Sequence, residues 1–176
     1  MTSLPRDRHK DLGLRPHSLV IGNFTPLIKE EDQASLLKAQ RKLRAREIDT
    51  EVLFWRDGPL EDDLRSMAQR YHIADSVHFG PHAGDSEVFF AVCDVVVFCG
   101  FEHPDIDALI QAMRSAKPVV ATRIPGYRDL IEDGRTGFLV PCGFPERIEG
   151  VIKRLEANPD LRTRVGQAAG AAALRK

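Results

Sequence analysis

The sequence has no long apolar run and no even set of cysteines. None of its apolar stretches approaches the roughly 18 residues that a membrane-spanning helix needs. The opening segment, MTSLPRDRHKDLGLRPHS, is charged and lacks the apolar centre of a secretory signal. Cys93, Cys99 and Cys142 are odd in number, and two of them lie in apolar surroundings. Buried thiols in a reducing compartment explain them better than a disulfide framework, so we expect a cytoplasmic protein.

An excess of charge of one sign is also missing. The formal net charge is −1, which excludes the basic footprint of a nucleic-acid-binding protein. With 43% hydrophobic and 29% charged residues over 176 positions, the chain has ordinary globular usage and can bury a core. The basic run KAQRKLRAR lies in a helix predicted at residues 30–47, with no Trp or Phe opposite it. A solvated helix face therefore explains the run better than a lipid-binding patch.

The glycine-rich phosphate loops of many nucleotide-binding proteins are absent. The first apolar run is followed by GNFTPLIK, which matches neither G-x-G-x-x-G nor a Walker loop. The acidic residues that a response regulator needs at this place are missing as well. His78 and His82 are four positions apart, but Pro81 interrupts them and no Cys or acidic partner completes a metal-binding set. We expect neither a metal nor another cofactor.

What is present is a regular alternation of apolar runs and amphipathic segments. It predicts strands at 18–23, 50–55, 76–80, 94–99, 118–122 and 136–141, with helices between them and two closing helices separated near Asn158-Pro159. Such alternation is typical of a doubly wound α/β domain with a parallel sheet of about six strands, covered on both faces. Residues 1–17 are predicted to be a flexible lead-in or interdomain linker, and residues 18–176 the domain itself.

A sheet of this kind binds ligands beyond the carboxyl ends of its strands, where the strand order reverses. The loops starting near residues 23, 56, 80, 99 and 123 are therefore candidates. In the loop GFEHPDID, Asp105 can cap the following helix and Asp107 adds a favourable charge to its first turn. Capping does not explain Glu102 and His103, which makes this loop the strongest functional hint in the sequence.

Seven blocks in a fixed order resemble the C-terminal, donor-binding domain of family-4 (group 1) glycosyltransferases, from residue 18 to the end. They are DGP (57–59), VHF (77–79), DVVVF (94–98), AM (112–113), KPVVAT (117–122), IEDGRTGFLVP (131–141) and NPDLRTRVGQAA (158–169). The resemblance implies one half of the GT-B architecture, in which two Rossmann-like domains face a cleft. The C-terminal half holds a nucleoside-diphosphate sugar, and the N-terminal half, absent here, holds the acceptor.

The donor-site residues implied by the resemblance fit only in part. The family follows its first strand with an Arg and then a Lys for the donor phosphates. Here Gly22 is followed by Asn23 at the Arg position and Ile28 stands at the Lys position, with Lys29 one place later. The two family glutamates near the sugar and the ribose fall on His103 and Gln111, and Glu102 lies one residue off register.

The phosphate-binding loop departs further from the family pattern. The family loop is rich in glycine, whereas this chain has Pro104, which lacks an N–H, followed by Asp105 and Asp107. A carboxylate about 4 Å from a phosphate charge costs roughly 1 to 4 kcal/mol. We therefore expect a weak donor site and assign no catalytic residue. By position, the site comprises Gly22, Asn23, Lys29, Glu102, His103, Asp105, Ile106 and Gln111.

The resemblance implies hexosyl transfer from a nucleoside-diphosphate sugar to a glycan or cell-envelope acceptor. Its partners would be the sugar nucleotide and the N-terminal acceptor domain, through which the protein could also associate with a membrane surface. The isolated domain is expected to be inactive. Two alternatives stay open, namely a non-catalytic scaffold domain with a degenerate donor site and a domain of a related sugar-nucleotide epimerase.

Overall fold

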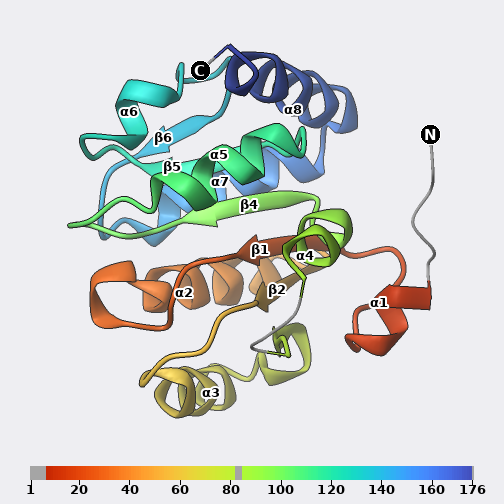
Figure 1. Cartoon of the computed structure of the whole chain (residues 1–176). Coiled ribbons are helices and arrows are strands. Elements are labelled where there is room, and N and C mark those ends of the chain that lie inside the picture. The colour runs from red at the N-terminus through yellow and green to blue at the C-terminus, as the bar shows by residue number, and fades with distance from the viewer. Residues whose placement is uncertain (1–6, 82–84, 176) are drawn as a thin grey trace.

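The structure is a computed structural model that describes residues 7–81 and 85–175. It has a single parallel sheet between two layers of helices (Figure 1). No helix among these residues is long and apolar enough to cross a membrane. His82, considered above as a metal ligand, lies outside the described residues, and within them no group of three or more His, Cys, Asp or Glu side chains could hold a metal ion.

The sheet confirms the predicted fold class. All of its neighbouring strands pair in parallel, in the order β3-β2-β1-β4-β5-β6. The strand order therefore reverses between β1 and β4, which lie side by side at the centre of the sheet. The strands are β1 (Leu19–Asn23), β2 (Thr50–Phe54), β3 (Val77–Phe79), β4 (Val95–Phe98), β5 (Val119–Thr122) and β6 (Phe138–Val140).

Helices cover both faces of this sheet, as its continuous apolar strands require. In Figure 1, α5 lies on the near face and α7 on the far face. The helical elements are α1 (Asp7–Asp11), η1 (Lys29–Glu31), α2 (Gln33–Ala45), α3 (Glu61–Arg70), η2 (Ala74–Ser76), α4 (Ser86–Val92), α5 (Ile106–Arg114), α6 (Tyr127–Leu130), α7 (Pro145–Glu156) and α8 (Pro159–Ala173).

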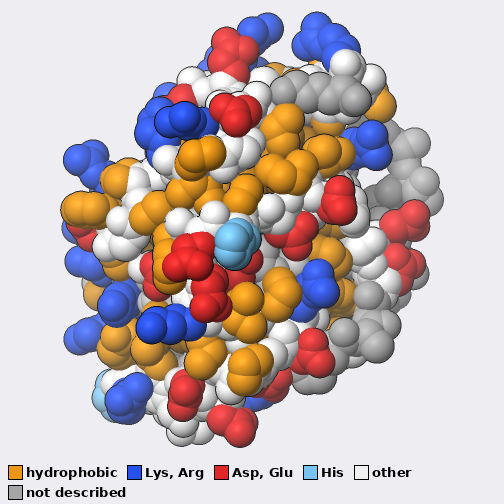
Figure 2. Space-filling model, turned by 60° about the vertical axis from the view of Figure 1, so that its left-hand side comes forward, with side chains coloured by type: hydrophobic (Ala, Val, Ile, Leu, Met, Phe, Trp, Pro, Cys, Tyr) orange, Lys and Arg blue, Asp and Glu red, His pale blue; other side chains and the backbone are white. Residues whose placement is uncertain are grey.

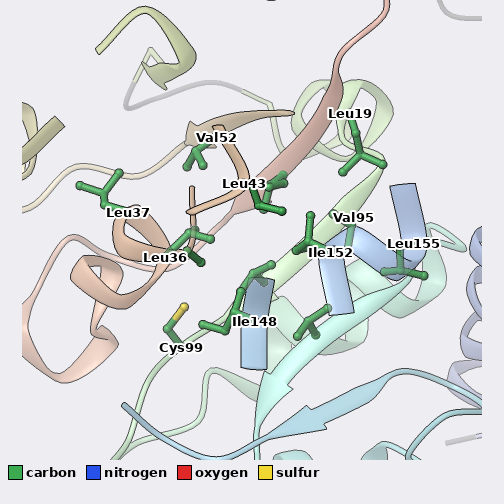
Figure 3. Close-up of a cluster of buried hydrophobic side chains, with 14 of the residues drawn as sticks. Leu19, Leu36, Leu37, Leu43, Val52, Val95, Cys99, Ile148, Ile152 and Leu155 are labelled. Atoms are coloured by element: carbon green, nitrogen blue, oxygen red, sulfur yellow. The ribbon is translucent and has the colours of Figure 1, made fainter. Parts of the chain in front are cut away.

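Each face of the sheet has its own apolar core, because successive strand residues point to opposite sides. On β4, Val95 and Val97 belong to one core, while Val96 and Phe98 belong to the other. Figure 3 shows the first core, where side chains of α2 and α7 converge on β1 and β4. Cys93 and Cys99 are buried free thiols, as expected from the sequence.

The N-terminal segment is not a free lead-in from residue 7 onward. Leu14 is 4% exposed and packs in the core on the near side of the sheet. The Arg15 backbone N–H donates to Glu51 at 2.8 Å, and the Arg15 side chain pairs with the same carboxylate. Residues 7–17 are therefore packed against the domain rather than flexible, because a single apolar residue, Leu14, and one buried carboxylate on β2 hold the segment in place.

The predicted helix at 30–47 is also interrupted. Residues 29–31 form the 3-10 turn η1, and Asp32 then adopts a left-handed backbone conformation, with φ of 43°, before α2 begins at Gln33. This break turns Glu31 inward, where its residue is only 5% exposed. The turn therefore buries the Glu31 carboxyl group near the carboxyl end of β1, where the candidate ligand loops begin.

Candidate functional site

The carboxyl ends of β1 and β4 lie next to each other, and their loops meet at the point where the strand order reverses. The Phe101 backbone N–H donates to the Glu30 carbonyl at 3.0 Å, which joins the loop after β4 to η1. Figure 2 shows the face toward which these strands point, with Asp and Glu side chains gathered beside a histidine. The candidate ligand edge is therefore predominantly acidic at its centre.

Asn23, at the end of β1, is fully buried and serves the sheet itself. Its amide nitrogen donates to the Val97 carbonyl at 2.9 Å, and its amide oxygen accepts from the Thr25 hydroxyl at 3.2 Å. Gln33 reaches the same hydroxyl at 3.2 Å from the start of α2. The side chain of Asn23 thus links two strands and a loop.

The loop after β4 leads into α5 through a capped helix terminus. Asp105 accepts from the Ala108 N–H at 3.0 Å, which confirms the predicted N-cap, and its own N–H donates to the Tyr127 hydroxyl at 3.1 Å. The Thr122 hydroxyl, at the end of β5, donates a hydrogen bond to the Gly100 carbonyl in this loop. A phosphate approaching α5 would compete with the Asp105 side chain for the first-turn amides.

Glu31 lies directly beneath this loop. A Cβ added to Gly100 would lie 2.9 Å from Glu31 Oε2, and that oxygen is buried with no hydrogen-bond partner among the residues that the structure describes. Burial raises the pKa of the Glu31 carboxyl; Asp105 and Glu30 add to the increase, while the Thr25 hydroxyl and Arg56 oppose it. Glu31 is thus a carboxyl group at the acidic edge whose charged form is destabilised by burial.

Arg56 is the nearest described counter-charge to Asp105 in this loop cluster. Its Nη1 lies 4.0 Å from Asp105 Oδ2, and its guanidinium is 6.0 Å from the centroid of the Phe24 ring. Both Arg56 and Asp105 keep contact with solvent, so the pair is loose and either group can turn to a ligand. Arg56 follows β2, whose end lies beside β1 in the sheet.

The other predicted site residues are spread over the rim. Glu102 and His103 are exposed, with His103 Nε2 4.0 Å from Glu102 Oε2. Lys29 is exposed at the first position of η1. Gln111 is exposed on α5 and lines an open pocket of about 600 Å³ between α4 and α5, together with Phe90, Arg114 and Lys117.

Of the predicted set, the structure brings Gly22, Asn23 and Asp105 to the strand reversal, with Ile106 next in the chain as the first residue of α5. Sequence reasoning missed Glu31, Arg56 and Tyr127. Arg56 could have been found, because it directly follows a predicted strand. Glu31 and Tyr127 carry no such signal, since their burial comes from segments far away in the chain.

The family model described as Glycosyl transferases group 1 matches residues 6–171. The chain belongs to the group 1 glycosyltransferase family. The match begins within the segment predicted to be a lead-in, in agreement with the packing of Leu14. The Asp105 cap, the acidic rim and the buried Glu31 are therefore features of a glycosyltransferase domain.

Curated relatives are similar over much of this domain. A D-inositol 3-phosphate glycosyltransferase of Streptomyces scabiei is 33% identical over 112 residues, which is 62% of this chain and 25% of that protein. The alpha-D-kanosaminyltransferase of Streptomyces kanamyceticus is 27% identical over 87% of this chain and 39% of its own length. The chain spans less than half the length of the curated relatives it matches.

Solved structures share the fold. Anabaena HepE in complex with UDP-glucose matches with a TM-score of 0.88 at 22% identity, over 97% of this chain and 47% of that chain. The C-terminal domain of the group 1 glycosyl transferase LpcC from Francisella tularensis matches with a TM-score of 0.87 at 17% identity, over 99% and 93% of the two chains. The Rossmann-like sheet of this protein is thus that of a GT-B glycosyltransferase domain.

Proposed function

We propose that this chain is the donor-binding half of a group 1 glycosyltransferase that transfers a hexosyl unit from a nucleoside-diphosphate sugar. The observation that carries the proposal is the strand reversal between β1 and β4, where the loops of both strands and the start of α5 converge in a chain of this family. Structural neighbours crystallised with UDP-glucose and with UDP support a nucleotide-sugar ligand.

In this proposal the donor diphosphate approaches the amino end of α5, where backbone amides and the helix dipole favour negative charge. Arg56, 4.0 Å from Asp105, would turn from that carboxylate to the phosphates and help to stabilise the leaving diphosphate. The acceptor and the group that deprotonates it would come from an N-terminal acceptor domain. We place the reaction in the cytoplasm, where the free thiols of Cys93 and Cys99 stay reduced.

The acidic rim favours a second function, that of a scaffold domain with a degenerate donor site. Asp105 already occupies an amide of α5, and Glu31 adds a buried carboxyl beneath the loop. Both groups weaken the attraction of the site for a diphosphate. The two functions differ in one measurable respect, which is whether the chain binds a nucleotide at all.

Calorimetric titration of the chain with UDP, GDP and ADP at low salt tests the proposal. We expect weak binding of one nucleotide, and loss of that binding in Arg56→Ala. Arg135→Ala is the matched control, because Arg135 is exposed and pairs with Glu132 rather than with a residue of the site. Absence of heat with all three nucleotides would favour the scaffold, and equal binding by both arginine variants would place the nucleotide elsewhere.

A further inference from the structure

Glu31 holds a position that ordinary surface acids do not have. Its residue is 5% exposed, and among the described side chains its Oε2 is one of the buried polar atoms without a partner. That oxygen faces the backbone of Gly100, which approaches closely because it has no Cβ. A charge at Oε2 is therefore separated from a ligand at the loop only by the chain around Gly100, and little water screens it.

The charged groups around Glu31 come from several elements. Asp105, before α5, and Glu30, on the same 3-10 turn, are like charges, and Arg56, after β2, is the opposing one. Cys99, at the end of β4, and Tyr127, on α6, also face this region, and burial raises the pKa of both well above its usual range, so they are neutral. A diphosphate at α5 would add further negative charge to an acidic group of side chains.

We propose that Glu31 takes up a proton from solvent when a donor diphosphate binds at the start of α5, so that nucleotide-sugar affinity rises as pH falls. This inference rests on the proposed function. The proton adds to the carboxyl of Glu31 and neutralises its charge, while the diphosphate keeps its own charge. By linkage, an anion that favours the protonated carboxyl binds more tightly when that proton is already present.

The geometry explains why Glu31 and not its neighbours would carry this proton. Asp105 accepts a cap hydrogen bond from the Ala108 N–H and lies 4.0 Å from Arg56. Glu102 is half exposed and therefore solvated. Glu31 Oε2 is buried and has no hydrogen-bond partner in the described part of the chain, and the raised pKa of the Glu31 carboxyl agrees with this environment.

The experiment is calorimetric titration with UDP-glucose at pH 5.5 and pH 7.5, in two buffers of different ionisation enthalpy at each pH. UDP-glucose is the probe because its diphosphate diester has no proton that titrates in this range. We expect native affinity to rise by up to about tenfold per pH unit, the limit for uptake of one proton. Because the buffer supplies this proton, the observed heat should also differ between the two buffers, by the difference between their ionisation enthalpies for each proton taken up.

Three variants separate Glu31 from other groups. Glu31→Gln keeps the shape of the side chain and should bind UDP-glucose equally at both pH values, with no buffer-dependent heat. Glu30→Gln and His103→Gln are controls that should keep the pH dependence; the second matters because histidines change charge between pH 5 and 8. Thermal unfolding of each variant verifies that it is folded.

Each outcome decides the inference. Binding with the same affinity at both pH values in the native chain, or the same pH dependence in Glu31→Gln, overturns it and leaves the proposed function intact. Binding by Glu31→Gln alone also overturns it, because the native carboxyl then takes up no proton on binding, although the result would show that the charge of Glu31 opposes the ligand. If neither chain binds UDP-glucose at either pH, the inference and the proposed function both fail. Should Glu31→Gln not fold, absence of buffer-dependent heat in the native chain still overturns the inference, and its persistence in both Glu30→Gln and His103→Gln supports it.

Discussion

Asp133 and Arg123 together close the exposed edge of the sheet. Asp133 Oδ2 lies 2.6 Å from Arg123 Nη2, and Asp133 Oδ1 accepts from the Leu139 backbone N–H at 2.9 Å. Arg123 also reaches the Leu139 carbonyl at 3.4 Å. Leu139 is on β6, the edge strand of the sheet that the described residues form, and its outward backbone groups pair with no strand of that sheet. The pair satisfies the outward N–H and C=O of Leu139, which another chain could otherwise bind.

Asp133→Ala should lower the free energy of unfolding by about 1 to 2 kcal/mol, because it leaves the Leu139 N–H without its acceptor. Arg123→Ala should cost less, since both side chains of the ion pair are about half exposed. Urea unfolding measures both. Asp133→Asn is the control that keeps an oxygen for Leu139, so equal losses from Asn and Ala would contradict the assigned role of that hydrogen bond.

Gly22→Ala should destabilise the protein by about 1 to 3 kcal/mol through overpacking. A Cβ at this position would lie 2.5 Å from the Phe89 ring, and still nearer to the Cys93 sulfur. Gly150→Ala is the matched control, because its Cβ would meet nothing within 4 Å and it lies inside α7. That change should stabilise by about 0.5 to 1 kcal/mol. Thermal or urea unfolding of both variants tests the pair, and a stable Gly22→Ala would refute the close packing.

Glu51 should make the fold sensitive to acid. Although burial by itself raises the pKa of this carboxyl, hydrogen bonds from His78 at 3.1 Å, Ser18 at 2.5 Å and the Arg15 N–H outweigh it and lower the pKa to about 2. A depressed folded-state value means that the stabilisation is complete above the ordinary value of 4.5 and is lost as pH falls toward 2. We expect a loss of about 3 kcal/mol over this window.

The test compares the unfolding free energy of native chain and Glu51→Gln from pH 5 to pH 2. The native curve should fall more steeply, and the variant should be less stable at pH 5, because Gln cannot accept four charge-assisted contacts. Glu132→Gln is a suitable control, since Glu132 is exposed. Parallel native and Glu51→Gln curves would show that Glu51 does not titrate in this window.

Replacing Asp105 and Asp107 together by Gly should strengthen the binding of UDP at low salt by about tenfold or more. The change removes two carboxylates near the proposed phosphate position and frees the Ala108 amide. Because Gly replaces an Asp cap at a cost of only tenths of a kcal/mol, the helix should stay folded. Calorimetry on both chains measures the difference. Tight native binding that weakens in the double variant would mean that the aspartates organise the ligand.

The sequence by itself determined the fold class and much of the local structure. The apolar runs predicted six strands close to their observed bounds, because buried parallel strands need continuous apolar residues whatever surrounds them. The Asp105 cap and the start of α8 after Asn158 were also predicted correctly, since a cap depends on residues within one helical turn. The order and spacing of the motifs indicated the glycosyltransferase family.

Only the tertiary structure decided which polar side chains of the site are buried. Asn23 occupies a predicted ligand position, yet its amide is held by Val97, from a strand far along the chain. Glu31 was expected on a helix, and the break at Asp32 together with the loop at Gly100 encloses it. Burial and desolvation are set by segments distant in sequence, so no local pattern reveals them. The same holds for Leu14, whose place in the core turns a predicted lead-in into part of the domain.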